Sequence, residues 1–282
     1  MKKMTRIAAL ILALLLAASC LAGCQQSQAK TYKVLDENFG AENYAIGFRK
    51  EDVALGLEVQ KILDEMISDG KAAEISKKWF DSDILLKDAD YLEESEAPAG
   101  DTSLEDLKKR GELILGLDDS FPPMGFRDEE NNVVGFDIDL ATEVCKRMGV
   151  ELKIQPIDWD SKELELSSGR IDCIWNGMSV TDDRLEAMFM AKPYVANTQV
   201  IIVPENSEIK TKADLAGKKV GLQKGSSSLE ALMKDEATYN AIGEENITQL
   251  AENVTVFMDL KAGRIDAFIV DEIVGRYVIS HN

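Results

Sequence analysis

The chain has 282 residues, 45% of them hydrophobic, and its 51 acidic and 32 basic side chains give a formal net charge of −19. This apolar fraction, over this length, can bury a sizeable core, which we expect to be divided between two lobes. The strong negative charge argues against binding to nucleic acid and against electrostatic adhesion to anionic lipid. The single histidine, His281, gives no basis for histidine catalysis or a histidine metal site, and we expect no cofactor and no metal.

The first 24 residues have the pattern of a targeting segment. Three basic residues within the first six positions precede a short apolar stretch, residues 7–18, which is too short for a comfortable membrane span. Residues 21–24, LAGC, resemble a bacterial lipobox, in which Cys24 becomes the lipid-modified first residue after cleavage. We therefore expect residues 1–23 to be a lipoprotein signal peptide and residues 24–30 a tether, holding an extracytoplasmic protein at the outer face of the cytoplasmic membrane or in the periplasm. A plain cleaved signal or an uncleaved anchor remains open.

Residues 44–83 show a short strand, a long helical pattern and a second helix that closes on Trp79 and Phe80. Residues 88–103 are acidic, contain alanine, proline and glycine, and have no apolar periodicity. We predict that this second stretch is a linker.

From residue 113 the chain alternates strands with helical patterns. An apolar strand, residues 113–117, runs into DDSFPP, and GFDIDLATEV, the turn DWD and CIWNGMSVTDDR follow in turn up to Arg184. This alternation predicts a mostly parallel sheet, whose ligands bind beyond the carboxyl ends of its strands. Because acidic, aromatic, hydroxyl and guanidinium groups fall in those turns, we expect a pocket for a small zwitterion.

The last third of the chain repeats this strand and turn pattern. VGLQKGSSS, from Val220, places Gly225 and three serines at the start of a helix after a strand, which is an anion-binding arrangement. AGRIDAFIVDE, from Ala262, contains an apolar strand at residues 265–270 that ends in Asp271. An aspartate in that place is commonly a helix cap, and this alternative remains open.

These motifs, with KPY at Lys192, resemble the extracytoplasmic solute-binding proteins of polar amino-acid ABC transporters, family 3. The resemblance covers nearly all of the chain beyond the leader. It implies an α/β protein with the two-lobed type II periplasmic-binding fold, each lobe being a mixed, mostly parallel sheet flanked by helices. It also implies a monomer that is not an enzyme and that delivers a polar amino acid to an ABC permease after two lobes close on it. Arginine, lysine, ornithine, glutamine and cystine all remain possible ligands.

The resemblance also implies ligand contacts. Arg184 would pair with the ligand's α-carboxylate and Asp271 with its α-ammonium. Phe121 and Trp159 would sandwich the ligand side chain, and Asp118 would meet a polar or cationic tip. The other expected ligand-binding residues are Gly177, Ser179, Gln223, Ser226 and Ser227.

Some of these assignments have alternatives in the sequence. Arg184 follows Asp182 and Asp183 at a helix start, where an arginine can simply pair with acids on the helix surface. Asp119 and Trp175 are weaker candidates, because the first can face solvent and the second can pack between the lobes. Cys145 lies in a helical pattern and Cys173 in an apolar strand, so buried free thiols are favoured over a disulfide.

The order of the pieces departs from the family pattern. Residues 44–83 resemble the family's C-terminal end, whereas the chain stops soon after Asp271, where a family member would continue. We predict a circularly permuted chain in which residues 88–103 join the family's usual C- and N-terminal ends. A truncated tandem fusion is the rival interpretation, and natural and engineered origins both remain open.

Under the permutation, lobe I contains residues 43–87 and 104–197, and lobe II contains residues 31–42 and 198–282. The chain would cross between the lobes near residues 197–199 and again near residues 39–44.

Two other functions fit the same fold. A sensor lipoprotein would bind an amino acid without transporting it, and the sequence does not separate it from a transport receptor. An enzyme resembling periplasmic dehydratases would need a positioned general acid or base, for which Glu272 or Asp118 could be considered.

Overall fold

The structure is a computed structural model that describes residues 31–92 and 96–281. The expected signal peptide, the Cys24 lipidation site and most of the tether lie outside the described residues, as do residues 93–95 of the predicted linker. All elements below belong to one compact unit that begins at Tyr32. In the described part of the chain, no helix combines the length and apolarity needed to cross a bilayer.

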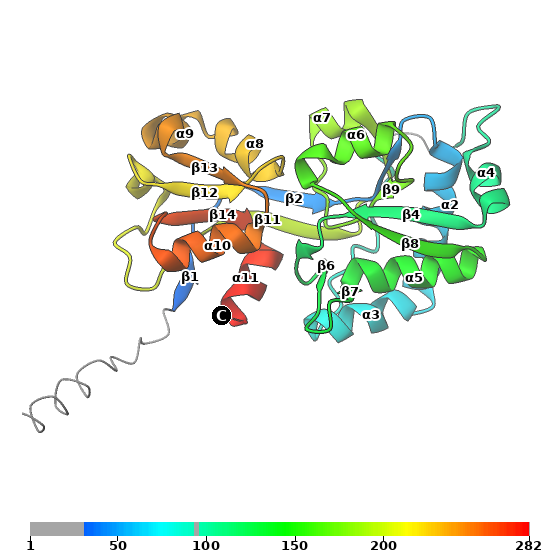
Figure 1. Ribbon diagram of the computed structural model, residues 1–282, viewed down its shortest axis with the longest axis horizontal. Helices are drawn as coiled ribbons and strands as arrows, with labels where there is room; N and C mark the ends of the chain where they lie inside the picture. Colours follow the sequence, from blue (N-terminus) through cyan, green and yellow to red (C-terminus); the bar gives the residue numbers. More distant parts are fainter. Residues whose placement is uncertain (1–30, 93–95, 282) are drawn as a thin grey trace, which may run out of the picture. The chain divides into compact units, whose positions relative to one another are not determined.

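Two main sheets organise the described residues (Figure 1). The six-stranded sheet has the order β1-β11-β14-β12-β13, with β2 also paired to β11. Its strands are β1 (Tyr32–Val34), β2 (Ala41–Tyr44), β11 (Val195–Pro204), β12 (Val220–Gln223), β13 (Ile247–Leu250) and β14 (Ala267–Asp271). The helices that pack with it are α8 (Ser227–Lys234), α9 (Glu236–Ile242), α10 (Asn253–Ala262) and α11 (Glu272–Ser280).

The five-stranded sheet has the order β10-β3-β9-β4-β8. Its strands are β3 (Gly47–Arg49), β4 (Glu112–Leu117), β8 (Glu151–Pro156), β9 (Cys173–Ile174) and β10 (Met188–Met190). The helices on this side are α2 (Val53–Ser68), α3 (Lys71–Phe80), α4 (Ser103–Arg110), α5 (Phe136–Met148), α6 (Lys162–Ser167) and α7 (Asp182–Ala187). A small sheet beside them contains β5 (Ser120–Phe121), β6 (Gly125–Arg127) and β7 (Val133–Val134).

The predicted alternation of strands and helices is confirmed. β4 forms where an apolar strand was expected and pairs in parallel with β8 and β9, while β12 pairs in parallel with β13 and β14. All five residues of β14 are buried, which explains its unbroken apolar run before the final aspartate. The structure therefore has the expected α/β class, with two mixed sheets flanked by helices.

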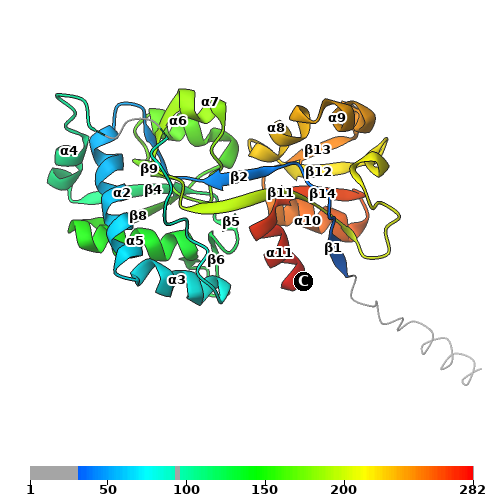
Figure 2. The same cartoon turned by 180° about the vertical axis from the view of Figure 1, so that it is seen from behind.

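The long strand β11 connects the two sheets (Figure 2). Its first residues pair with β2 and its later residues with β14, without interruption between Thr198 and Gln199. The strand expected at residues 199–203 is thus the second half of a ten-residue strand, because β2 supplies hydrogen-bonding partners to the first half.

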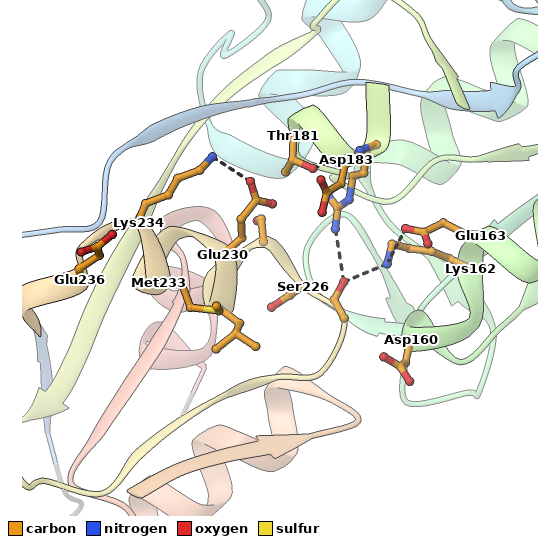
Figure 3. A pocket seen from close by; sticks show the side chains of 14 residues that line it. Asp160, Lys162, Glu163, Thr181, Asp183, Ser226, Glu230, Met233, Lys234 and Glu236 are labelled. Atoms are coloured by element: carbon orange, nitrogen blue, oxygen red, sulfur yellow. Dashed lines mark hydrogen bonds and ion pairs between the residues drawn. The ribbon is translucent and has the colours of Figure 1, made fainter. Parts of the chain in front are cut away.

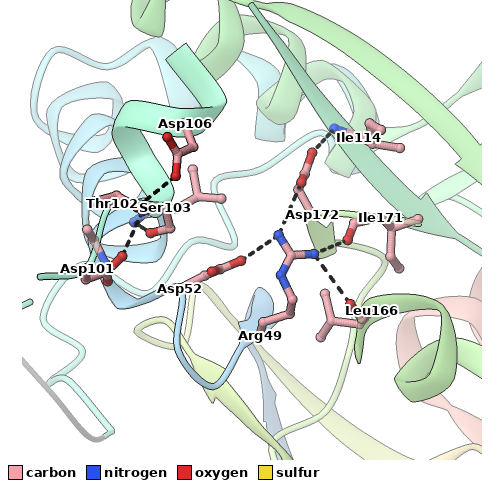
Figure 4. Close-up of polar contacts among 12 residues, drawn as sticks. Arg49, Asp52, Asp101, Thr102, Ser103, Asp106, Ile114, Leu166, Ile171 and Asp172 are labelled. Atoms are coloured by element: carbon pink, nitrogen blue, oxygen red, sulfur yellow. Dashed lines mark hydrogen bonds and ion pairs between the residues drawn. The ribbon is translucent and has the colours of Figure 1, made fainter. Parts of the chain in front are cut away.

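Strand β3 is an interior strand of the five-stranded sheet, held between β9 and β10. Arg49, at its end, donates to the carbonyl of Ile171 (2.6 Å) and forms ion pairs with Asp52 (2.6 Å) and Asp172 (3.3 Å) (Figure 4). Asp172 also accepts from the Ile114 amide (2.8 Å) and from Arg110. These bonds tie the stretch that contains β3 to β4 and to the turn before β9.

Cys145 and Cys173 are both buried and free, which confirms the expectation of buried thiols. Burial raises the pKa of the Cys145 thiol to about 12 and places that of Cys173 well above its usual value. Both side chains therefore act as small apolar core residues.

We expect the Asp172→Asn substitution to lower the free energy of unfolding by about 2–4 kcal/mol, because it removes the buried carboxylate that Arg49, Arg110 and the Ile114 amide share. Urea denaturation monitored by circular dichroism measures this. The matched control is Glu74→Gln, which removes an exposed ion pair to Lys71 and should change stability by less than about 1 kcal/mol. Equal small effects of both substitutions would show that the Asp172 cluster does not hold β3 in place.

Candidate functional site

The expected site residues lie at the carboxyl ends of strands in both sheets. Asp118 follows β4 directly, whereas Gln223 and Asp271 are the last residues of β12 and β14. Gln223 Nε2 donates to Asp118 Oδ2 at 2.7 Å, so residues from the two sheets meet. The carboxyl ends of these strands therefore face one site.

Asp118 is buried, and both of its carboxylate oxygens accept hydrogen bonds. It accepts from the amide and the hydroxyl of Ser120 (2.8 and 2.6 Å) in addition to Gln223. Burial raises its pKa above the usual value, although these donors act in the opposite direction. Gln223 is oriented in turn by Asn253, which donates to its Oε1 at 2.8 Å. This bridge is available to contact a polar ligand tip, but Asp118 is not an unpaired acid.

Arg184 lies inside the site and not on the helix surface. Thr181 caps α7, and Arg184, in the first turn of this helix, is only 5% exposed. Its guanidinium donates to the carbonyl of Ser179 (2.7 Å) and to that of Gly225 (3.4 Å), which follows β12. Burial lowers the pKa of this arginine from its very high usual value.

Lys162, a residue that we did not select from the sequence, is a second buried cation in the site. It is 4% exposed, and its Nζ donates to the carbonyls of Gly225 (2.9 Å) and Trp159 (3.3 Å). Its Nζ is 5.2 Å from the centroid of the Trp159 ring, and Arg184 Cζ is 5.9 Å from it. Burial, and then the charge of Arg184, lower the pKa of Lys162 to about 8. The only sequence signal was its place three residues after Trp159 in a turn expected to bind ligand.

The two cations border a cavity of about 650 Å³ (Figure 3). This volume is within the range of pockets that bind small molecules. Its other lining residues include Thr181, Ser226 and Ser227. A smaller cavity of about 270 Å³ shares Thr181 and Ser227 with it and is also lined by Glu42.

Asp271 is 3% exposed and forms no side-chain cap on α11, so the helix-cap alternative is not realised. Its Oδ1 accepts from the hydroxyl of Tyr44 and from Asn197 Nδ2, both at 2.7 Å. The same Asn197 nitrogen donates to Glu42 at 2.7 Å. Glu42 and Tyr44 lie on β2 and face the site. Their only sequence signal was that positions 42 and 44 point to one face of a strand expected to cross between the lobes.

Among the remaining expected residues, Ser227 contacts Ser179 and Gly177 lies against Phe121. The hydroxyl of Ser227 donates to that of Ser179 at 3.0 Å, and Ser226 caps α8. Gly177 has φ +55°, and a Cβ atom there would lie 2.9 Å from the Phe121 ring, so the glycine allows this close approach. Phe121 and Trp159 are both buried.

The two weaker candidates lie elsewhere. Asp119 pairs with the partly exposed Arg127 at 2.6 Å, and Trp175 is buried against Tyr194 with ring centroids 6.3 Å apart.

Comparison with known proteins now decides the family. Residues 113–256, just over half of the chain, match the bacterial extracellular solute-binding proteins, family 3. The chain belongs to this family. The two-lobed periplasmic-binding fold expected from the sequence is accordingly confirmed.

Curated relatives of this family 3 protein are named for amino acids. The L-cystine-binding protein TcyJ of Escherichia coli (strain K12) is 32% identical over 172 residues, covering 60% of this chain and 62% of that protein. The glutamine-binding protein of Geobacillus stearothermophilus is 33% identical, covering 64% and 69% respectively. The chain thus spans about three fifths to two thirds of the length of these two relatives.

Solved structures give the same result. A substrate-binding protein of an ABC uptake transporter from Streptococcus pneumoniae, with bound histidine, is 36% identical with a TM-score of 0.62, covering 65% of this chain and 75% of that one. The arginine-bound form of truncated ArgBP from T. maritima is 37% identical with a TM-score of 0.59, covering 63% and 82%. These relatives are named as binding proteins and not as enzymes.

The backbone at Gly225 approaches that of Asp160 closely in this solute-binding protein. A Cβ atom at Gly225 would lie 2.9 Å from the backbone Cα of Asp160. We expect Gly225→Ala to weaken solute binding by about 5- to 150-fold, since overpacking of this size costs about 1–3 kcal/mol. Isothermal titration calorimetry measures this loss.

Gly217→Ala is the matched control for this substitution. Gly217 has a similar backbone angle, φ +63° against +70°, but nothing lies within 4 Å of the added Cβ atom. The two variants share the strain of a left-handed alanine, and only Gly225→Ala should weaken binding. Equal losses would assign the effect to backbone strain.

Lys162 should make the stability of the ligand-free protein depend on alkaline pH. Its folded pKa of about 8 lies below the usual value of about 10.4, so unfolding binds a proton between these limits. Stability should therefore rise with pH across this window, by an amount on the order of 1–3 kcal/mol. Lys162→Met should lack this contribution when thermal unfolding is compared from pH 8 to 10.5. Parallel pH profiles for both proteins would contradict the assignment.

Proposed function

We propose that this protein is a non-catalytic receptor that captures a polar amino acid between its two lobes and delivers it to an ABC permease. The observation that supports this most directly is the placement of the Arg184 guanidinium and the Asp271 carboxylate in one buried site. A guanidinium matches the α-carboxylate of an amino acid, and a carboxylate matches its α-ammonium group. Lys162 adds a second cation on the carboxylate side.

The site also supports a polar ligand side chain. The bridge between Asp118 and Gln223 offers a carboxylate and an amide, and the indole ring of Trp159 is buried in the same lobe as Asp118. We propose arginine, lysine, ornithine, glutamine or cystine as the ligand, in line with the cystine, glutamine and arginine that the names of the relatives give. The histidine-bound structure adds histidine to the set to be tested.

We further propose that the chain order is circularly permuted, with lobe I formed by residues 43–87 and 104–197 and lobe II by residues 31–42 and 198–282. The interior position of β3, encoded before β4, β9 and β10, supports this order. The segment at residues 88–103 would join what are ordinarily the two ends. Lipid attachment through Cys24 at the outer face of the membrane remains part of the same proposal.

The alternative functions lead to different expectations. A dehydratase-like enzyme would need a free general acid or base, whereas Asp118 accepts three hydrogen bonds and Glu272 pairs with Arg276 at 2.6 Å. A sensor would bind the same amino acid without supporting its uptake. Uptake measured in cells that have this chain as their sole binding protein separates receptor from sensor.

Thermal unfolding of the chain from residue 25 onward, with each proposed amino acid and histidine, tests ligand capture. We expect one polar amino acid to raise Tm by several degrees, since it binds only the folded state. Arg184→Ala should abolish that shift, because it removes the bidentate partner of the desolvated α-carboxylate, at a cost of about 2–5 kcal/mol. Arg264→Ala, which removes an exposed arginine paired to Asp259, is the control and should keep the shift. A cooperative transition with no shift for any of these amino acids would contradict the proposed function.

A further inference from the structure

Glu42 places a second carboxyl group beside the acid expected to bind the ligand's ammonium group. Its Oε1 accepts from three neutral donors: Ser179 Oγ at 2.6 Å, Asn197 Nδ2 at 2.7 Å and Gln199 Nε2 at 2.8 Å. Three converging donors hold this side chain in one position in the smaller cavity of the site. Glu42 is therefore a built part of the site and not a surface acid that happens to face it.

The two carboxyl groups are close enough to interact directly. Asn197 Nδ2 donates to Glu42 Oε1 and to Asp271 Oδ1 at 2.7 Å each, so these two oxygens lie within twice that distance. Asp271 is buried and Glu42 is partly buried, and two carboxyl groups this close in such a setting do not both ionise readily, because like charges repel strongly where water screens them little. One proton shared by the pair relieves this repulsion.

The cations near the pair are bonded to other groups and do not replace that proton. Arg184 is the nearest cation from α7, but its guanidinium donates to the backbone carbonyls of Ser179 and Gly225. Tyr44, from β2, donates its hydroxyl proton to Asp271. From α8, Lys234 pairs with Glu230 at 2.8 Å, and both line the cavity next to Glu42. Burial, followed by the charge of Glu42, raises the pKa of Asp271 well above its usual value.

We propose that Glu42 and Asp271 together form the ammonium site and hold one proton between them until the ammonium group of the ligand replaces it. The inference rests on the proposed function. When the ligand binds, the shared proton leaves to solvent, the ammonium group keeps its own protons, and both acids become carboxylates. The exchange conserves charge in the buried site, because one positive charge takes the place of another.

This exchange couples capture to pH. Where the pair is protonated, binding releases about one proton, so the affinity should fall by about tenfold for each unit of decrease in pH. At pH values where the pair is already ionised, the affinity should no longer depend on pH. The receptor would then bind an amine-bearing ligand more weakly in acidic surroundings.

Calorimetry in buffers with different heats of ionisation measures the released proton directly. L-arginine and L-glutamine are both tried as probes, and the one that binds more tightly is used. We expect about one proton to be released by the wild type at mildly acidic pH, and release close to zero for Glu42→Gln. Glutamine keeps the carbonyl oxygen that accepts from Ser179, Asn197 and Gln199, but it cannot ionise. The affinity of the Glu42→Gln variant for the probe should also lose most of its dependence on pH.

Glu205→Gln is the control, since Glu205 is an exposed acid on the turn after β11. It should release protons as the wild type does. Equal proton release by wild type and Glu42→Gln, with the ligand bound normally, would overturn the inference while leaving the proposed function intact.

Infrared spectra of the ligand-free proteins give a test that does not depend on any ligand. The carbonyl stretch of a protonated carboxyl group should be present in the wild type and in Glu205→Gln at neutral pH. The same component of this band should be lost in Glu42→Gln and in Asp271→Asn. Asp137, whose pKa burial raises to about 7, adds a component that all four proteins share. An unchanged spectrum in both variants would overturn the inference. Failure of both probes to bind, with the band present, would count against the proposed function alone.

Discussion

The site depends on how buried charges are compensated. Arg184 and Lys162 are cations removed from water, and the carbonyl oxygen of Gly225 accepts from both of them. Burial of an unpaired charge is strongly unfavourable, so each of these cations needs such a partner. The partner comes from the segment after β12, whereas the cations belong to the segments around the five-stranded sheet. The shared carbonyl can therefore stabilise both cations only when both sets of strands contribute to the site.

The site residues that follow strands were predictable from the sequence. Asp118, Asp271 and Gln223 each stand at the end of an apolar strand, and parallel strands bring such positions to one edge. Arg184 was found through its motif, and its burial depends on the cap formed by Thr181 and on the carbonyl of Ser179. These contacts are local, so short patterns are enough to predict them.

Residues whose role depends on distant contacts were missed. Glu42 meets Ser179 across 137 positions, and Lys162 meets Gly225 across 63. A glutamate on a short strand and a lysine at a helix start ordinarily face solvent, so neither residue type indicates burial. For the same reason the first half of β11 was not expected: its pairing partner, β2, is encoded about 150 residues earlier. Local periodicity does not reveal which distant segment will bury a polar side chain.

The shared carbonyl of Gly225 also bears on kinetics. Lys162 and Arg184 both donate to this carbonyl, so these bonds must break when the two sides of the site separate. The rate of capture should then saturate at high ligand concentration, at the rate at which these bonds open. Capture would be limited by opening of the site and not by its encounter with the solute.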